Sequence, residues 1–208
     1  MADVERHEFF PTCIYRFKHD FKENELNDVV KHIEDNSLSE QNGQVIKRTG
    51  SQTQNELHKI DTFANLTKTI INATKSILDE QGYMGEVEIT NMWGNILRPQ
   101  SQRAHAPHTH SNNFLSGVFY LKTSDDTSPI QFFDPRPQSD VLKPRKKEYN
   151  RLNSNIAQFQ SETGWGVVFP SWLQHWVPET KDERMSIAWN IIVRGEYGEP
   201  NALQNAHI

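Results

Sequence analysis

The sequence predicts an α+β fold of mainly β structure, and three features indicate it. Two stretches with the apolar spacing of helices lie within the first 82 residues. From residue 86 onward, apolar residues recur at every second position, between turns rich in Gly, Pro, Asn and Asp. A chain of 208 residues is long enough for one good core and short for two. We therefore expect a single domain over residues 1–208, with its N-terminal helices packed on one face of a strand-rich core.

Composition narrows the class of protein. Hydrophobic residues make up 35% of the chain and charged residues 24%, which is typical of a soluble globular protein. The net charge of −5 argues against nonspecific nucleic-acid binding by the whole surface. Cys13 is the only cysteine, so an internal disulfide is excluded and a reducing compartment fits. No apolar run suits a signal peptide or a membrane span, and we expect a cytoplasmic protein.

The N-terminal part, residues 8–82, is predicted to hold one strand and two helices. Residues 8–17 have the content of a strand, in which Pro11 indicates an edge position or a break. Asp20 and Glu23 form a capping-box pattern for a first helix. Its apolar stripe comprises Leu26, Val29, Val30 and Ile33.

The second helix is marked more clearly. Its apolar residues are spaced three and four apart, namely Phe63, Leu66, Ile70, Ala73 and Ile77. Asp61 is the predicted cap and Gly82 the predicted stop. The polar residues 39–55 between the helices predict a loop, with a candidate short strand at Gln44–Lys47.

The core is predicted to run from residue 86 to residue 194, with a loose tail over 195–208. Candidate strands are 86–95, 114–123, 130–135, 151–160, 165–170, 175–177 and 184–194, and 98–107 is a predicted loop. Residues 135–150 hold three prolines, and the segment Lys143–Arg151 has five basic residues in nine. We expect a solvated excursion there, with a loop at the rim of a site as the alternative.

Alternation assigns the polar residues of three strands to faces. In the strand from residue 86, Val87, Ile89, Asn91, Trp93 and Asn95 share one face. Such an inward Asn95 is either a satisfied structural amide or a contact to a ligand. In the strand from Phe114, the shared face carries Ser116, Val118 and Tyr120. The last strand separates Arg184, Ser186, Ala188 and Asn190 from Met185, Ile187, Trp189 and Ile191.

Three histidines suggest a metal site. His108 and His110 are spaced i, i+2, so on an extended backbone both imidazoles would point to one side. His175 follows a predicted buried strand. Neutral imidazole is a good ligand for Fe(II) and Zn(II). The alternative is that the first two histidines lie on an exposed loop and that His175 packs between two tryptophans.

Arg184 suggests an anion site. An arginine on the inward face of a strand must meet an anion or an acidic side chain, because a buried unpaired charge is costly. Ser186 faces the same way, and Tyr120 could add a third donor. A guanidinium with adjacent hydroxyls suits one carboxylate. A metal together with this clamp suggests a dicarboxylic co-substrate.

These residues also carry a family resemblance. The segments HTHSNNFLSGVFYL, FFDPR and GWGVVFPSWLQHWVPETKDERMSIAWN resemble a bacterial and bacteriophage branch of the 2-oxoglutarate/Fe(II)-dependent oxygenases, similar to prolyl 4-hydroxylases. The similarity covers about residues 86–193. It implies a double-stranded β-helix core of the jelly-roll, cupin-like type, with Fe(II), 2-oxoglutarate and O₂ as cofactor and co-substrates.

The resemblance also implies roles for individual residues. His175 matches the distal iron ligand, and Arg184 and Ser186 match the residues that bind the C5 carboxylate of 2-oxoglutarate. Tyr120 and Asn95 match positions that commonly contact the co-substrate.

One position departs from the family. The wider superfamily has Asp or Glu two residues after the first histidine, where this chain has His110. We favour His108, His110 and His175 as metal ligands. The alternatives are a carboxylate recruited from Asp134 or the replacement of one histidine by His105. Three histidines with an open position are also a catalytic zinc arrangement.

We therefore expect a dioxygenase that hydroxylates a substrate and releases succinate and CO₂. The resemblance suggests a peptidyl or free amino-acid residue as the substrate, by analogy of fold. The alternatives are a three-histidine zinc hydrolase or hydratase and a non-catalytic β-barrel that binds sugars or peptides. The basic segment Lys143–Arg151 could attract an acidic partner, and the aromatic-rich strands offer a surface for a homodimer.

Overall fold

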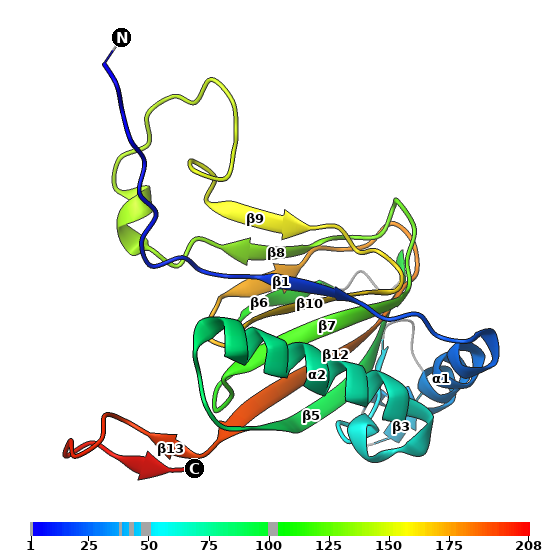
Figure 1. The fold of residues 1–208 in the computed structure, drawn as a ribbon. Coiled ribbons are helices and arrows are strands. Elements are labelled where there is room, and N and C mark those ends of the chain that lie inside the picture. The colour runs from blue at the N-terminus through cyan, green and yellow to red at the C-terminus, as the bar shows by residue number, and fades with distance from the viewer. Residues whose placement is uncertain (1, 38, 42–43, 47–50, 100–103) are drawn as a thin grey trace.

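The computed structural model describes residues 2–37, 39–41, 44–46, 51–99 and 104–208. Its two helices are α1 (Glu23–Asn36) and α2 (Ala64–Gln81), and Figure 1 shows α2 lying across one face of a twisted sheet. Among the described helices, none is long and apolar enough to span a membrane.

The described strands form two larger antiparallel sheets. In the first sheet the order is β1-β10-β7-β12-β5-β4, and in the second it is β6-β11-β8-β9. The first sheet comprises β1 (Tyr15–Lys18), β4 (Ser51–Gln52), β5 (Glu86–Leu97), β7 (Leu115–Lys122), β10 (Trp165–Pro170) and β12 (Arg184–Arg194). The second comprises β6 (His105–His108), β8 (Ile130–Phe133), β9 (Ile156–Phe159) and β11 (His175–Val177). Because the chain passes repeatedly between the two sheets, the core has the arrangement of a jelly roll.

The core has two layers. The first lies between the helices and the larger sheet, and β12 contributes Met185, Ile187, Trp189 and Ile191 to it. The second lies between the sheets and contains Leu97, Val118, Tyr120, Ile130, Phe132, Val167, Phe169, Leu173 and Val177. The predicted division of β12 into two faces is thereby confirmed. So is the prediction of a mainly β fold with N-terminal helices on one face.

A close approach in the first layer requires glycine on β7. A Cβ atom at Gly117 would lie 2.2 Å from Cζ2 of Trp189 and 2.8 Å from the carbonyl oxygen of Val167. Because Trp189 is fully buried, it has no room to move away. Gly117 therefore makes the space for the largest buried side chain of β12.

A β-bulge in β5 overturns one predicted face. Asn190 of β12 pairs with Asn91, but the next residue, Ile191, pairs with Ile89, so Thr90 is an extra residue on β5. Before the bulge, Ile89 faces the helices, and after it Met92 and Ile96 do so. Trp93 and Asn95 instead line the space between the sheets. The prediction that Val87, Ile89, Asn91, Trp93 and Asn95 share a face was wrong, because strict alternation holds only in an unbroken strand.

The strand predicted over residues 8–17 is shorter than expected. It is limited to β1, Tyr15–Lys18, at the edge of the larger sheet, and the described residues before Tyr15 form no strand. Pro11 lies in the irregular segment that precedes the strand. This position suits proline, because its ring nitrogen has no hydrogen to donate to a neighbouring strand.

The predicted side-chain caps of the helices were wrong, whereas the apolar stripes are confirmed. α1 begins at Glu23 after Lys22 without a side-chain cap, and Asp20 instead pairs with Lys18. Asp61 belongs to a 3₁₀ turn, Asp61–Phe63, that leads directly into α2. Gly82 ends α2 in the left-handed conformation, with φ 72°, as predicted. Of the predicted stripes, Val29, Ile33, Phe63, Leu66, Ile70 and Ile77 are buried in the core, and Leu26 and Val30 pack against it.

Several predicted loops contain short strands. Residues 98–107 overlap β6, and residues 39–55 contain β2 (Ser39–Gln41), β3 (Gln44–Ile46) and β4. Lys47, at the end of the candidate strand there, lies outside the described residues. The predicted loose tail forms a hairpin of β13 (Glu196–Tyr197) and β14 (Ala206–His207).

Candidate metal centre

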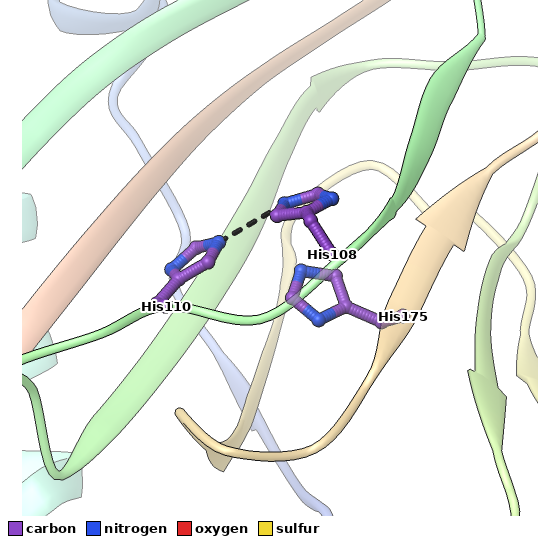
Figure 2. Close-up of side chains that lie close together, drawn as sticks. All are labelled: His108, His110 and His175. Carbon is purple, nitrogen blue, oxygen red and sulfur yellow. Dashed lines mark hydrogen bonds between the residues drawn. The ribbon is translucent and has the colours of Figure 1, made fainter.

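Three histidines from separate points of the chain converge between the two sheets. His108 ends β6, His110 follows in the connection to β7, and His175 begins β11. β6 and β11 are neighbours in the smaller sheet, and their register places His175 opposite His108. Figure 2 shows the three rings directed toward one another. One ligand atom from each ring lies within 4.8 Å of the other two.

Backbone carbonyl groups fix the orientation of two rings. Nδ1 of His108 lies 2.7 Å from the carbonyl oxygen of Ala106, and Nδ1 of His175 lies 2.9 Å from that of Leu173. Because a carbonyl oxygen only accepts hydrogen bonds, each Nδ1 carries the hydrogen. Each Nε2 therefore presents a lone pair, as a metal ligand must.

His110 is oriented by side chains instead. Its Nδ1 donates a short hydrogen bond to Oδ1 of Asn190 and lies 3.0 Å from Oγ of Ser116. The same Ser116 hydroxyl donates to Asn190 Oδ1 at 2.8 Å and lies 2.7 Å from Oγ of Ser171. This network keeps the hydrogen of His110 on Nδ1 and leaves Nε2 as the free ligand atom.

The distance between two of these ligand atoms fits one metal ion. Nε2 of His108 lies 3.1 Å from Nε2 of His110, and with both hydrogens on Nδ1 the two lone pairs face each other. Such an arrangement is repulsive unless a cation lies between them. Two metal–nitrogen bonds of about 2.1 Å that open at roughly 90–110° place their nitrogens about 3.0–3.4 Å apart. The donor set therefore fits a divalent ion.

Burial keeps two of the three imidazoles, those of His110 and His175, neutral. Desolvation lowers the pKa of His175 to about 4 and also lowers the pKa of His110. Both rings are therefore unprotonated near neutral pH, in the form that binds metal.

The two alternative ligands from the sequence lie outside the cluster. Both carboxylate oxygens of Asp134 accept hydrogen bonds from Arg136, at 2.9 Å and 2.8 Å. The hydrogen bond from Arg136 is the main reason that the pKa of Asp134 falls to about 2. His105 lines the same cavity as the three histidines but does not join their cluster. Within the described part of the chain, the three-histidine group contains no carboxylate.

A cavity of about 350 Å³ extends from the histidines between the sheets. The residues that line it on the polar side include Gln52, Asn95, His105, Arg184 and Ser186. The apolar side includes Trp93, Val118, Ile130, Phe169, Val177 and Ala188. The cavity thus joins the three-histidine cluster to Arg184.

Arg184 is buried without a compensating charge. It is 1% exposed, and no carboxylate in the described residues pairs with it. Its Nε donates to Ser161 Oγ at 3.2 Å and its Nη1 to Ser186 Oγ at 3.0 Å. The guanidinium carbon lies 4.9 Å from the centre of the Tyr120 ring. A buried guanidinium with only hydroxyl partners attracts an anion strongly.

A second unsatisfied group lies beside Arg184. The hydroxyl of Tyr120 is buried and has no hydrogen-bond partner among the described residues. Tyr120 pairs with Ser186 across β7 and β12, so both donors approach from neighbouring strands. A carboxylate bound to Arg184 would offer an acceptor to both hydroxyls. The donor set therefore fits the distal carboxylate of a dicarboxylic acid.

The structure brings the three favoured histidines and the predicted co-substrate residues to this region, whereas Asp134 lies elsewhere. Asn95 lines the cavity from β5, where its Oδ1 accepts a hydrogen bond of 2.8 Å from Gln52. The roles of Gln52 and Trp93 were not predicted, nor was the network of Ser116, Ser171 and Asn190. Alternation alone had already placed Asn190 on the face of Arg184, whereas nothing in the sequence marks Gln52.

Comparison with known proteins agrees with this geometry. Residues 91–190 match a family described as "Putative 2OG-Fe(II) oxygenase". Similar solved structures include the non-heme α-ketoglutarate-dependent epimerase SnoN from nogalamycin biosynthesis, with TM-score 0.61 and 9% identity over 92% of this chain and 83% of that one. A Pseudomonas putida prolyl-4-hydroxylase has TM-score 0.56 and 12% identity over 88% and 94%.

A third structure is a Trichoplax adhaerens prolyl hydroxylase in complex with a peptide fragment of the oxygen degradation domain of hypoxia inducible factor. It has TM-score 0.57 and 9% identity, over 86% of this chain and 83% of that one. A search of the curated proteins by sequence found no match.

The architecture is thus a double-stranded β-helix, as predicted, with a three-histidine cluster inside it. Its β-rich part, residues 91–190, is similar to the 2OG-Fe(II) oxygenase family. This family uses Fe(II), 2-oxoglutarate and O₂, and the histidine cluster fits iron, as expected from the sequence.

Proposed function

We propose that this protein is a 2-oxoglutarate- and Fe(II)-dependent dioxygenase that hydroxylates its substrate and releases succinate and CO₂. The observation that carries the proposal is the pairing of two unsatisfied sites in one cavity. Three imidazole lone pairs converge at one end, and the uncompensated guanidinium of Arg184 lies in the same space.

His108, His110 and His175 are the proposed iron ligands, each through Nε2. The carbonyl groups of Ala106 and Leu173 and the side chain of Asn190 hold the three rings in the ligating tautomer. When bound, the iron and 2-oxoglutarate together supply the oxidising power of the reaction. The chain supplies position, charge and a dry environment.

Arg184, Ser186 and Tyr120 are the proposed partners of the C5 carboxylate of 2-oxoglutarate. Asn95 is proposed to contact the co-substrate from β5. Val118, Ile130 and Phe169 line the cavity with apolar groups, which excludes water and strengthens the pairing of the carboxylate with Arg184.

Trp93 lines the cavity beside the histidine cluster. The ring of Trp93 lies 6.1 Å from that of His110, and Gln52 lies beside it at the exposed rim of the cavity. We propose a peptidyl or free amino-acid residue as the substrate, since two of the similar structures are prolyl hydroxylases and one holds a peptide. Cys13 as the only cysteine supports a reducing, cytoplasmic setting.

The test is an anaerobic titration of the Fe(II)-loaded protein with 2-oxoglutarate, followed by the visible metal-to-ligand charge-transfer absorption. We expect the band in the wild type and its loss in Arg184→Met, with iron content unchanged in both. Absence of the band from demonstrably iron-loaded wild type would overturn the proposal. A three-histidine zinc hydrolase would then explain the metal cluster, but it would leave Arg184 without a ligand.

A further inference from the structure

The connection between β8 and β9 concentrates positive charge in an acidic protein. Residues 134–155 contain six basic and three acidic residues, whereas the whole chain has a net charge of −5. The basic residues are Arg136, Lys143, Arg145, Lys146, Lys147 and Arg151. We call residues 134–155 the basic connection.

The basic connection encloses a cavity of about 370 Å³. Five of its six cations line this cavity, together with the apolar Leu142 and Leu152 and the amides of Asn153 and Asn155. Among the described lining residues Asp134 is the only acidic one, and Arg136 already binds both of its oxygens.

Three other cations of the cavity, Arg145, Lys146 and Lys147, have no charged partner among the described residues. Lys146 lies 3.4 Å from the amide oxygen of Asn155 and 4.8 Å from the centre of the Tyr149 ring, and neither partner is charged. In the described residues, Arg145 and Lys147 have no carboxylate within ion-pair distance. A concave surface with this excess of positive charge attracts an anionic ligand.

The basic connection leaves the β-helix at the same end as the histidines. Phe132 of β8 lies opposite His175, and the backbone N–H of Phe133 donates to the carbonyl group of Gln174. The basic connection begins at the following residue, Asp134. In Figure 1 the connection projects beyond the sheets from this end of β8 and β9. A long ligand held there could therefore extend toward the metal centre.

The edge strand β9 adds a second feature beside the cavity. β9 is the last strand of the smaller sheet and follows Asn155 directly. The backbone N–H of Asp134 donates to the carbonyl group of Asn155, so these two residues form a hydrogen-bonded pair of the antiparallel ladder. Hydrogen-bonded pairs recur at every second position, so residues 132/157 and 130/159 are the next such pairs of β8 and β9. Ile156 and Gln158 consequently turn their N–H and C=O groups outward. Such an edge can accept an extended peptide as an additional strand.

From these two features we propose that the basic connection and the edge of β9 bind an acidic peptide segment in extended conformation. The segment belongs to the substrate or to a partner that delivers it, so the inference deepens the proposed oxygenase function and rests on it. A peptide fits better than a nucleic acid. Only a peptide backbone completes the outward N–H and C=O groups of Ile156 and Gln158, and the surface as a whole is acidic.

The test measures fluorescence anisotropy of a labelled polyglutamate peptide with the full chain. We expect salt-sensitive binding that Arg145→Glu/Lys147→Glu weakens by about tenfold or more. The matched control is Lys68→Glu/Lys75→Glu, which makes the same charge change on the exposed face of α2. Equal weakening by both double variants would overturn the assignment of the site, as would no weakening by the first.

A second variant tests the strand edge. Gln158→Pro removes one outward N–H group without breaking the ladder with β8, and we expect it to weaken peptide binding while the melting temperature stays close to that of the wild type. Unchanged affinity in Gln158→Pro would overturn strand addition. An oligothymidylate of equal charge serves as the competitor, and tighter binding of this DNA than of polyglutamate would overturn the peptide assignment.

Separate measurements test the oxygenase function and the binding of an acidic peptide. Peptide binding is measured without iron or 2-oxoglutarate, so it is independent of the charge-transfer titration. We expect Arg145→Glu/Lys147→Glu to leave that titration unchanged, because neither residue lines the cavity of the metal centre. Loss of the charge-transfer band with intact peptide binding would refute the oxygenase alone.

Discussion

Nε2 of His108 and Nε2 of His110 lie 3.1 Å apart, although Nδ1 of each ring already forms a hydrogen bond to an oxygen atom. Two lone pairs at this distance repel each other in a metal-free protein. A divalent ion between them removes the repulsion and gains ligand bonds, so metal binding should stabilise the fold.

The first prediction concerns metal removal. After chelation, addition of Co(II) or Fe(II) should raise the melting temperature of the wild type, because the ion binds only the folded protein. His110→Ala should abolish this increase, while its metal-free form should melt at or above the temperature of the metal-free wild type. An equal metal-induced increase in both proteins would exclude His110 as a ligand.

The second prediction concerns Asn190, which accepts the hydrogen bond of His110. Asn190→Ala leaves the His110 ring free to rotate and should lower metal affinity roughly 10–100-fold, as loss of an outer hydrogen bond typically does. Asn190→Asp keeps an acceptor at the same place and should retain affinity. Competition with a chromophoric chelator measures both. Equal affinities in the alanine variant and the wild type would show that the ring is held by packing alone.

The third prediction concerns the charge of Arg184. Because no carboxylate of the described residues compensates it, Arg184→Met should leave the protein folded and at least as stable without ligand. In contrast, 2-oxoglutarate at about 100 times its Kd should stabilise the metal-loaded wild type by about 2.7 kcal/mol and the variant hardly at all. Thermal melts with and without 2-oxoglutarate give both quantities, and equal stabilisation of the two proteins would contradict the assignment.

The fourth prediction concerns pH and His19, which packs against Phe119 and is not part of the three-histidine cluster. Its ring lies 4.4 Å from that of Phe21, and its Nε2 is buried with no hydrogen-bond partner in the described part of the chain. Burial lowers the pKa of His19 below 6.5, so the unfolded chain binds a proton more readily than the folded one. The stability that depends on a neutral His19 is fully present above pH 6.5, where the ring is neutral in both the folded and the unfolded chain. It is lost as the pH falls from 6.5 toward the lower pKa of His19 in the folded protein.

Replacement of His19 separates its contribution to the pH dependence of stability from the contributions of the other histidines. His19→Gln should flatten part of the decline in melting temperature between about pH 7 and pH 5. Superimposable pH profiles of the variant and the wild type would show that His19 does not titrate in this window.

The fifth prediction concerns the contact of Gly117 with Trp189. Gly117→Ala should destabilise the fold by about 1–3 kcal/mol, because the added methyl group overlaps a ring that cannot move. Trp189→Phe in the same background should recover part of this loss, since the smaller ring vacates the space. Denaturant unfolding of the four proteins gives the coupling energy, and additive effects would argue against a direct clash.

Much of the site could be predicted because its residues are separated by simple spacings. The histidine pair and the Arg184–Ser186 pair each lie two residues apart in extended segments, so each pair shares a direction. The strand β12 alternates without interruption over the residues that carry Arg184, Ser186 and Asn190. The alternation of side chains along an extended segment is sufficient to predict such features.

Other features depend on contacts between distant segments. Gln52 reaches the cavity only because β4 pairs with β5, and a strand of two residues has no periodicity to detect. The helix caps were mispredicted because Asp20 prefers Lys18 to the first turn of α1, where Lys22 takes the cap position. In each case a tertiary or neighbouring partner outweighs the local preference.

Thr90 determines which of two sets of side chains meets the cavity. Up to this residue the strand presents its odd-numbered positions Val87 and Ile89 to the helices, and beyond it the even-numbered Met92 and Ile96 take their place. Deletion of this one residue would restore strict alternation. It would send Trp93 and Asn95 into the helix-covered core and bring their apolar neighbours to the metal. A single inserted residue thus lets one strand serve both as a packing surface for the helices and as a wall of the cavity between the sheets.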